Sequence, residues 1–199
     1  MKRMVKSFLA IFSIFILSQN LVADEQIDLK NHLLSKISEI ITVVENKTLT
    51  KGQRNLEITN EVRPMFDFEL MAKLSLGKRA WKKLKIDERK QFTELYVKRM
   101  ENSYSSKLDA YNGEKVEVKK IKQLKKNRIT LVTDLVNGDN KFEVVYKFYK
   151  PKKQKESKDK WLIYDVEISG VSILKADQAQ FREVLRKKTI YELMNSFTK

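Results

Sequence analysis

The stretch Trp161-Leu-Ile-Tyr-Asp-Val-Glu-Ile-Ser-Gly-Val-Ser172 alternates apolar and polar side chains. Its even positions begin with four apolar residues, namely Leu162, Tyr164, Val166 and Ile168. Asp165 and Glu167 fall between them, and this two-residue period is typical of a strand with one buried face. Gly170 follows as a turn residue before the C-terminal segment. The stretch therefore predicts a strand whose apolar face must pack against other parts of the chain.

Three more strands are expected before this one, so that the sheet occupies residues 115–169. Val116 and Val118 alternate with charged residues, and Asn137-Gly138 is a hairpin signal between two longer strands. An even-length turn at this dipeptide fixes which residues share a face of the sheet. That face carries Ile129, Leu131, Thr133, Leu135, Phe142, Val144, Tyr146 and Phe148. Because nearly all of these are apolar, we expect a curved four-stranded antiparallel sheet with one dry face.

Amphipathic helices are expected on either side of the sheet, within residues 27–110 and 175–198. Residues 27–49 carry apolar side chains at spacings of three and four, which is typical of a helix with one buried face. Asp67 is a suitable N-cap for a further helix that Gly77 ends. The apolar stripe of that helix consists of Leu70, Met71 and Leu74. The predicted class is α+β, with helices wrapped around the sheet, and composition does not choose between a filled core and a cavity.

The first 23 residues have the pattern of a secretory signal peptide. Residues 1–6 are basic, residues 8–17 are apolar, and Ala23 is a small residue at the expected cleavage site. The apolar run is shorter than the roughly 20 residues that a membrane span needs, and a retained membrane anchor is the alternative reading. We therefore expect residues 1–23 to be removed on export and residues 24–199 to form a single domain.

The chain is basic and contains no cysteine, so disulfides, thiolate metal sites and lipoprotein acylation are excluded. Removal of Lys2, Arg3 and Lys6 with the signal peptide leaves +12 of the formal charge of +15. Such a charge favours a partner of opposite sign. Export makes nucleic acid the weakest of these partners, which leaves anionic lipid headgroups or an acidic protein surface.

The residues that most enzymes need are missing. His32 is the only histidine, and the chain has no glycine-rich phosphate loop and no recognisable metal-ligand spacing. Asp165 and Glu167 share one strand face, which we interpret as solvated, and Asp67 is explained by its role as an N-cap. The sequence therefore predicts neither a catalytic site nor a metal or cofactor site.

The segment 151–160 contains five lysines together with Glu156 and Asp159. We interpret it as a solvated hairpin loop rather than as a docking element.

Three separated blocks of the sequence resemble the MlaC family, which is also known as the toluene-tolerance or Tol-related family. The blocks are Phe66-Asp-Phe-Glu-Leu-Met-Ala-Lys-Leu-Ser-Leu-Gly77 followed by Trp81; Tyr104 to Val118 with Tyr111 and Gly113; and Trp161 to Val166 with Gly170-Val-Ser172 and Gln180-Phe181. They occur in the family's order and span most of the chain after the signal peptide.

The resemblance implies a periplasmic phospholipid carrier. Such a carrier moves lipid between an outer-membrane lipoprotein complex and an inner-membrane ABC transporter that maintains outer-membrane lipid asymmetry. It also implies that the helices and the sheet enclose an apolar pocket for acyl chains, with phospholipid as cargo in a monomeric protein. On this basis the expected lipid-binding residues are Leu70, Met71, Leu74, Tyr104, Leu131, Val144, Tyr146, Tyr164, Val166, Val171 and Ile173.

Two other functions remain open at this point. The first is a periplasmic adaptor or chaperone that carries no lipid, in which the apolar face is filled core and a basic surface binds an acidic partner. The second is an enzyme on a similar scaffold, which rests on analogy of fold alone.

Overall fold

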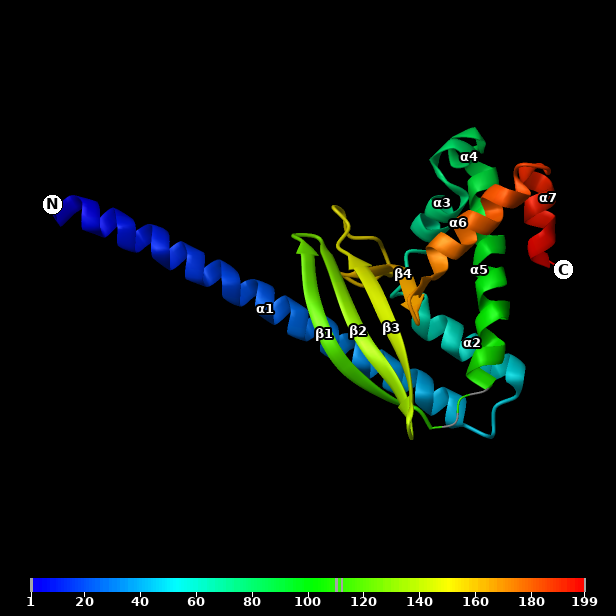
Figure 1. The fold of residues 1–199 in the computed structure, drawn as a ribbon, viewed down its shortest axis with the longest axis horizontal. Coiled ribbons are helices and arrows are strands. Elements are labelled where there is room, and N and C mark those ends of the chain that lie inside the picture. Colours follow the sequence, from blue (N-terminus) through cyan, green and yellow to red (C-terminus); the bar gives the residue numbers. More distant parts are fainter. Residues whose placement is uncertain (1, 110, 112, 199) are drawn as a thin grey trace.

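The computed structural model describes the backbone of residues 2–109, 111 and 113–198 and the side chains of residues 24–103, 111 and 113–197. A helical N-terminal half precedes the strands, and shorter helices follow them (Figure 1). The helices are α1 (Lys2–Glu45), α2 (Lys51–Val62), α3 (Phe68–Leu76), α4 (Lys78–Lys83), α5 (Ile86–Asp109), α6 (Ile173–Val184) and α7 (Ile190–Asn195), followed by a 3-10 turn (Ser196–Thr198). The strands are β1 (Lys115–Lys125), β2 (Arg128–Asn137), β3 (Asn140–Tyr149), β4 (Leu162–Ile168) and β5 (Val171–Ser172). The predicted α+β class is confirmed.

The sheet is antiparallel and its strands lie in the order β1-β2-β3-β4-β5. The predicted hairpin register is confirmed, because Leu131 faces Tyr146 and Leu135 faces Phe142 across β2 and β3. The expected number of four strands is wrong, since the structure has a fifth. Ser169 and Gly170 both have positive φ, and they turn the chain so that β5 pairs with the end of β4. A strand of two residues is too short to show the alternation by which the others were found.

Strand β4 contains an irregularity that changes the direction of one side chain. Lys147 pairs with Asp165, but the next residue of β3, Phe148, pairs with Ile163. Tyr164 is therefore an extra residue in β4, as in a β-bulge. Alternation beyond the bulge is shifted by one residue, which the sequence pattern does not reveal.

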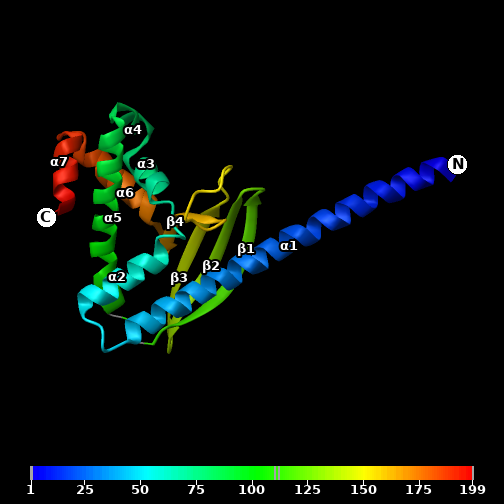
Figure 2. The ribbon, with the colours of Figure 1, turned by 180° about the vertical axis from the view of Figure 1, so that it is seen from behind.

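Helix α1 crosses one face of the sheet, as Figure 2 shows from behind. Leu29 and Leu33 of α1 are buried against apolar residues of the strands, and Leu33 belongs to the apolar stripe that the spacing in residues 27–49 predicts. We call this group the sheet cluster; it consists of Leu29, Leu33, Met65, Ile129, Leu131, Val144, Phe148, Trp161, Ile163 and Val166. The predicted signal peptide, residues 1–23, lies outside the side chains that the structure describes. Among the described residues, no helix combines the length and the hydrophobicity needed to cross a membrane.

A second core lies among the helices, and we call it the helix cluster. It consists of Met71, Ala72, Leu76, Trp81, Leu84, Phe92, Tyr96, Met100, Phe181, Leu193, Met194 and Phe197. Phe92 is central, because its ring meets Trp81, Phe181 and Phe197 edge-on at centroid distances of 5.6–6.3 Å. The predicted cap of α3 is confirmed, since the Asp67 carboxylate accepts a hydrogen bond from the Leu70 backbone N–H. Gly77 ends this helix with φ +82°, a conformation that glycine adopts easily.

Candidate functional site

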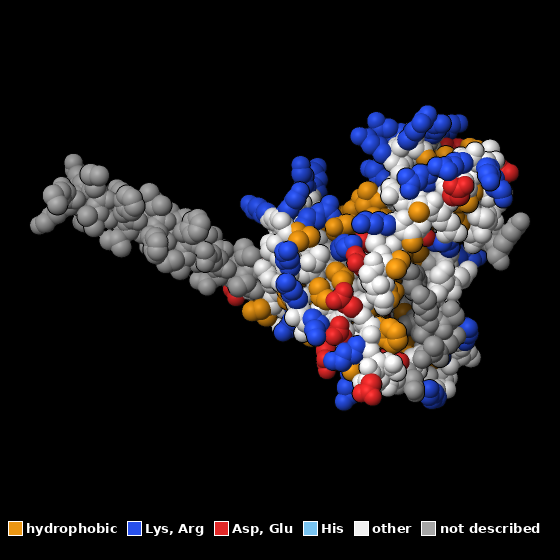
Figure 3. Space-filling model, in the orientation of Figure 1, with side chains coloured by type: hydrophobic (Ala, Val, Ile, Leu, Met, Phe, Trp, Pro, Cys, Tyr) orange, Lys and Arg blue, Asp and Glu red, His pale blue; other side chains and the backbone are white. Residues whose placement is uncertain are grey.

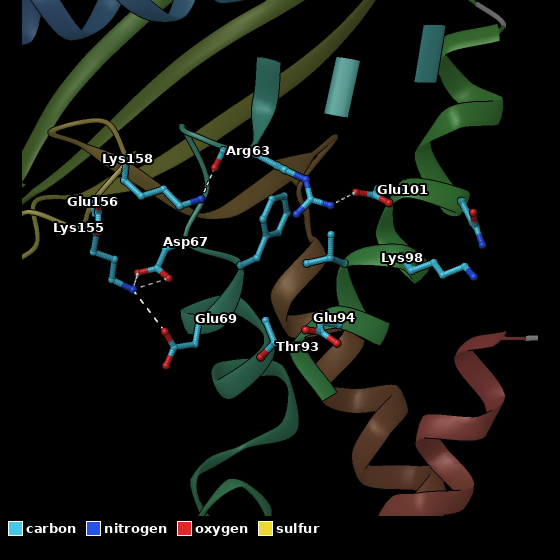
Figure 4. Close-up of a pocket in the computed structure, with 13 residues that line it drawn as sticks. Arg63, Asp67, Glu69, Thr93, Glu94, Lys98, Glu101, Lys155, Glu156 and Lys158 are labelled. Atoms are coloured by element: carbon cyan, nitrogen blue, oxygen red, sulfur yellow. Dashed lines mark hydrogen bonds and ion pairs between the residues drawn. The ribbon is translucent and has the colours of Figure 1, made fainter. Parts of the chain in front are cut away.

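A cleft of about 570 Å³ lies between α3, α5, the end of α2 and the loop that precedes β4 (Figure 4). Its size is within the range of about 300–1,000 Å³ typical of small-molecule sites. It is lined by Arg63, Asp67, Phe68, Glu69, Thr93, Glu94, Val97, Lys98, Glu101, Asn102, Lys155, Glu156 and Lys158. Among the described residues, no group of three or more His, Asp or Glu side chains is arranged to hold a metal ion. The cleft therefore offers apolar surface together with charges of both signs.

Asp67 is the most constrained charged group in the cleft. Its side chain is buried, and its carboxylate accepts hydrogen bonds from the Leu70 N–H, the Tyr149 hydroxyl and the Lys155 ammonium. The Lys155 Nζ lies 2.9 Å from Asp67 Oδ2. Burial by itself would raise the pKa of Asp67, but the hydrogen bonds from Tyr149, Lys155 and Leu70 outweigh it and hold the pKa below its usual value. Burial, together with the hydrogen bond to the Asp67 carboxylate, raises the pKa of Tyr149.

These contacts predict an acid-sensitive fold. Because the pKa of Asp67 is lower in the folded state, its carboxylate stabilises the protein fully above the unfolded-state pKa of about 4. That stabilisation is lost as the pH falls through the folded-state pKa. We expect Asp67→Asn to flatten the dependence of the free energy of unfolding on pH below about 4, as measured by urea unfolding. An unchanged slope in that range would mean that Asp67 is not the group that titrates.

Lys158 holds the loop against the entrance of the cleft. Its ammonium donates hydrogen bonds to the backbone carbonyls of Arg63 and Phe66 and lies 6.0 Å from the centre of the Phe68 ring. Burial lowers its pKa. An ammonium has three N–H donors, so one more acceptor can bind to Lys158 in addition to the two carbonyls.

The interpretation of segment 151–160 as a solvated loop holds for only part of it: Lys152, Lys153 and Glu156 are exposed, whereas Lys155, Lys158 and Asp159 are half-buried. Besides the contacts of Lys155 and Lys158, the Asp159 backbone N–H donates to the Pro64 carbonyl, and His32 Nε2 lies 2.7 Å from Asp159 Oδ2. The loop is docked on the segment between α2 and α3 because its lysines meet partners far away in the sequence. Lysine content alone does not distinguish this arrangement from a solvated loop.

Phe66 and Phe68 join the cleft to the interior of the protein. Their rings are stacked with centroids 5.3 Å apart. Phe68 lines the cleft and packs against the helix cluster, whereas Phe66 packs against both the helix cluster and the sheet cluster. The aromatic pair therefore stands where the cleft and the two apolar clusters meet.

The structure brings about half of the sequence-predicted site residues together. Leu131, Val144 and Val166 belong to the sheet cluster, and Tyr146 and Ile173 pack against it. Burial raises the pKa of Tyr146 to about 12, so its phenol stays neutral there. Met71 lies in the helix cluster instead, while Leu70 and Leu74 are half-buried in α3. Tyr104 lies outside the side chains that the structure describes.

Two of the predicted site residues lie away from the sheet cluster. Because of the bulge in β4, Tyr164 points away from the sheet cluster; its ring lies 6.1 Å from that of Tyr149, and Arg128 lies 4.3 Å from its centre. Val171 is 61% exposed, since β5 lies at the edge of the sheet. Neither side chain lines the interior.

Sequence reasoning missed the cleft itself. Of the predicted residues whose side chains are described, none lines it. Its residues are brought together from α2, α3, α5 and the loop before β4, and Lys155 is 88 residues away from Asp67. The one available signal is the position of Asp67 between two phenylalanines; the N-cap role accounts for its bond to the Leu70 N–H but not for those to Tyr149 and Lys155.

Comparison with known proteins agrees with this fold. The sequence profile of the family described as MlaC protein matches residues 35–199. The chain belongs to the MlaC family. This MlaC-family chain also resembles a solved structure, that of a phospholipid-binding protein from Ralstonia solanacearum in complex with a phospholipid. The TM-score is 0.72 over 84% of this chain and 93% of that one, at 14% sequence identity, which shows a shared fold. No curated protein matches the chain.

Proposed function

We propose that this MlaC-family chain is a periplasmic phospholipid carrier that buries acyl chains against the apolar face of its sheet. The observation that carries the proposal is the sheet cluster, in which strand residues such as Leu131 and Val144 present a continuous apolar face beneath α1. Family membership and the fold shared with a protein solved in complex with a phospholipid support it. The N-terminal signal pattern supports export.

The cost of exposing lipid to water explains why such a carrier needs apolar residues rather than reactive ones. Each methylene exposed to water costs about 0.8 kcal/mol, so an acyl chain of roughly sixteen carbons costs on the order of 12 kcal/mol. Polar groups without partners would be unfavourable next to such a chain. The buried Thr133, which pairs with Val144 of the sheet cluster, donates its hydroxyl to the Val144 carbonyl.

The route that we propose runs from the cleft to the sheet cluster. The phosphate of the headgroup binds near Lys155 and Lys158, where ammonium groups can donate charge-assisted hydrogen bonds. The acyl chains pass the Phe66–Phe68 pair and lie on the strand face that Leu29 and Leu33 of α1 now cover. Loading therefore requires α1 to move away from the sheet. The carrier would receive and deliver lipid at the outer-membrane lipoprotein complex and the inner-membrane ABC transporter that the resemblance implies.

Lipid extraction tests the proposal directly. We expect organic-solvent extracts of the purified protein to contain phospholipid at close to one molecule per chain, measured by mass spectrometry. Protein that has been stripped of lipid should acquire phospholipid again from vesicles. A protein without phospholipid, and unable to take any from vesicles, would contradict the carrier function.

The second candidate is an adaptor that carries no lipid. The observation in its favour is that the sheet cluster is closely packed in this structure, with Leu131 and Ile163 both 0% exposed. An adaptor would bind an acidic partner through its basic surface, with an affinity that falls as salt is added. Absence of lipid from the extracts would favour this reading.

A further inference from the structure

A dense group of basic side chains surrounds the short helix α4. Between Leu70 and Ile86 the chain contains six basic residues and no Asp or Glu. We call these six residues the α4 basic patch; they are Lys73, Lys78, Arg79, Lys82, Lys83 and Lys85. All six are exposed, and Lys and Arg side chains gather over α4 at the top of Figure 3. The proposed carrier site uses none of them.

The structure holds this patch outward by burying the opposite side of α4. Trp81 of α4 and Leu84, which follows the helix, are buried in the helix cluster, and Ala80 packs against it. The exposed side of α4 therefore carries only basic residues. Lys78, Arg79 and Lys82 then follow one another on the outer side, because residues four apart lie on the same face of a helix. Aromatic and cation–π contacts hold Trp81 in place: its ring centre lies 6.3 Å from that of Phe92, and the Arg89 guanidinium lies 5.8 Å from it.

Within the part of the chain whose side chains are described, only Lys85 of the patch has a carboxylate beside it, that of Glu88, which accepts from the Lys85 backbone N–H. Among the described side chains, none of the six residues of the patch forms an ion pair. Elsewhere lysines are paired, as Lys147 is with Asp165 and Lys150 is with Glu25. Like charges this close together repel one another, and a ligand of opposite charge removes that cost.

We propose that the α4 basic patch docks the protein on the surface of a membrane that contains anionic lipid. Five of its six basic residues are lysines, whose compact hydrated charge suits mobile headgroups. Specific protein interfaces are instead depleted in lysine. Ile86, which follows the patch at the start of α5, is 81% exposed, and an apolar side chain there can enter the headgroup region.

Docking through this patch would also orient the protein. Helix α3 runs from Phe68, which lines the cleft, to Leu76, two residues before Lys78 of the patch. Nine helical residues span about 13 Å. A protein docked through the patch would therefore hold its cleft about one helix length of α3 from the bilayer surface. The docking surface is separate from the lipid site, so each can be tested while the other is intact.

Vesicle flotation tests the docking surface. The purified protein is mixed with vesicles of phosphatidylcholine alone, or with vesicles that also contain about 30% phosphatidylglycerol. The protein bound to the vesicles is measured after centrifugation. We expect binding to the anionic vesicles only, and its loss when NaCl is raised from about 0.05 to about 0.5 M. Each lysine near an anionic surface contributes about fivefold, so Lys82→Gln with Lys83→Gln should weaken binding about 25-fold.

The matched control replaces two exposed lysines at the β1–β2 turn, by Lys125→Gln with Lys126→Gln. It removes the same charge and should change binding by less than about threefold, because these residues lie outside the patch. Equal losses in the two double variants would contradict a localised docking surface. Failure of the unaltered protein to bind anionic vesicles would overturn the proposal and leave an acidic protein as the partner. Both variants should keep the phospholipid content of the unaltered protein, so failure of docking and failure of lipid carriage give different results.

Discussion

Replacement of Leu131 by tryptophan is expected to reduce the phospholipid content of the purified protein by at least about tenfold. Leu131 is 0% exposed and lies in the middle of the sheet cluster, opposite Tyr146. A larger ring at this position fills space that the acyl chains are proposed to occupy, at an overpacking cost of about 1–3 kcal/mol. Lipid content is measured by solvent extraction and mass spectrometry, with circular dichroism to show that the variant is folded.

The matched control for this experiment is Val171→Trp. Val171 was expected from the sequence to lie in the pocket wall, but it is exposed at the edge of the sheet. We expect this variant to carry as much lipid as the unaltered protein. If a folded Leu131→Trp protein carried as much lipid as the control, acyl chains would not lie against the sheet cluster. Val144→Trp repeats the test at a second buried position, should Leu131→Trp fail to fold.

Replacement of Asp165 by alanine should lower the free energy of unfolding by about 3 kcal/mol. Asp165 is 2% exposed, and its carboxylate lies 2.9 Å from the Lys147 Nζ. It also accepts hydrogen bonds from the Ser172 hydroxyl and the Leu174 backbone N–H at the start of α6. One side chain thus ties β3, β4 and α6 together, and its loss leaves several donors without an acceptor.

Urea unfolding measures this effect, and Glu57→Ala serves as the control. Glu57 is an exposed carboxylate on α2, so its removal should change the free energy of unfolding by less than about 0.5 kcal/mol. Lys147 also pairs with Glu167 at 2.9 Å, which limits the loss in Asp165→Ala because the ammonium keeps one partner. A loss no larger than that of the control would show that the Asp165 network does not stabilise the junction.

The burial of Asp165 also shows where the sequence was misleading. The alternation of residues 162–168 placed Asp165 on the polar face of β4, and that face was interpreted as solvated. The side chain does lie on that face, where it meets Lys147 of β3. What covers the face is the turn into α6, where Ser172 and Leu174 donate to the carboxylate. Alternation indicates which side of a strand a residue takes, but not what the rest of the chain places there.

The sequence by itself determined the features that depend on neighbouring residues. The caps of α3, the apolar stripe of α1 and the register of the β2–β3 hairpin follow from short-range spacing, because helix and strand periods decide which side chains share a face. The family was also recognisable from three blocks of residues, and the profile match over residues 35–199 confirms it.

Only the tertiary structure decided the bulge at Tyr164, the docked loop and the cleft around Asp67. Each of these depends on contacts between segments far apart in the chain, such as Lys155 with Asp67. A bulge inserts one residue without changing composition, and an ion pair across 88 residues leaves no periodic trace. The sequence of β4 therefore showed that this strand has a dry face, but packing against β3 decided which of its residues point toward that face.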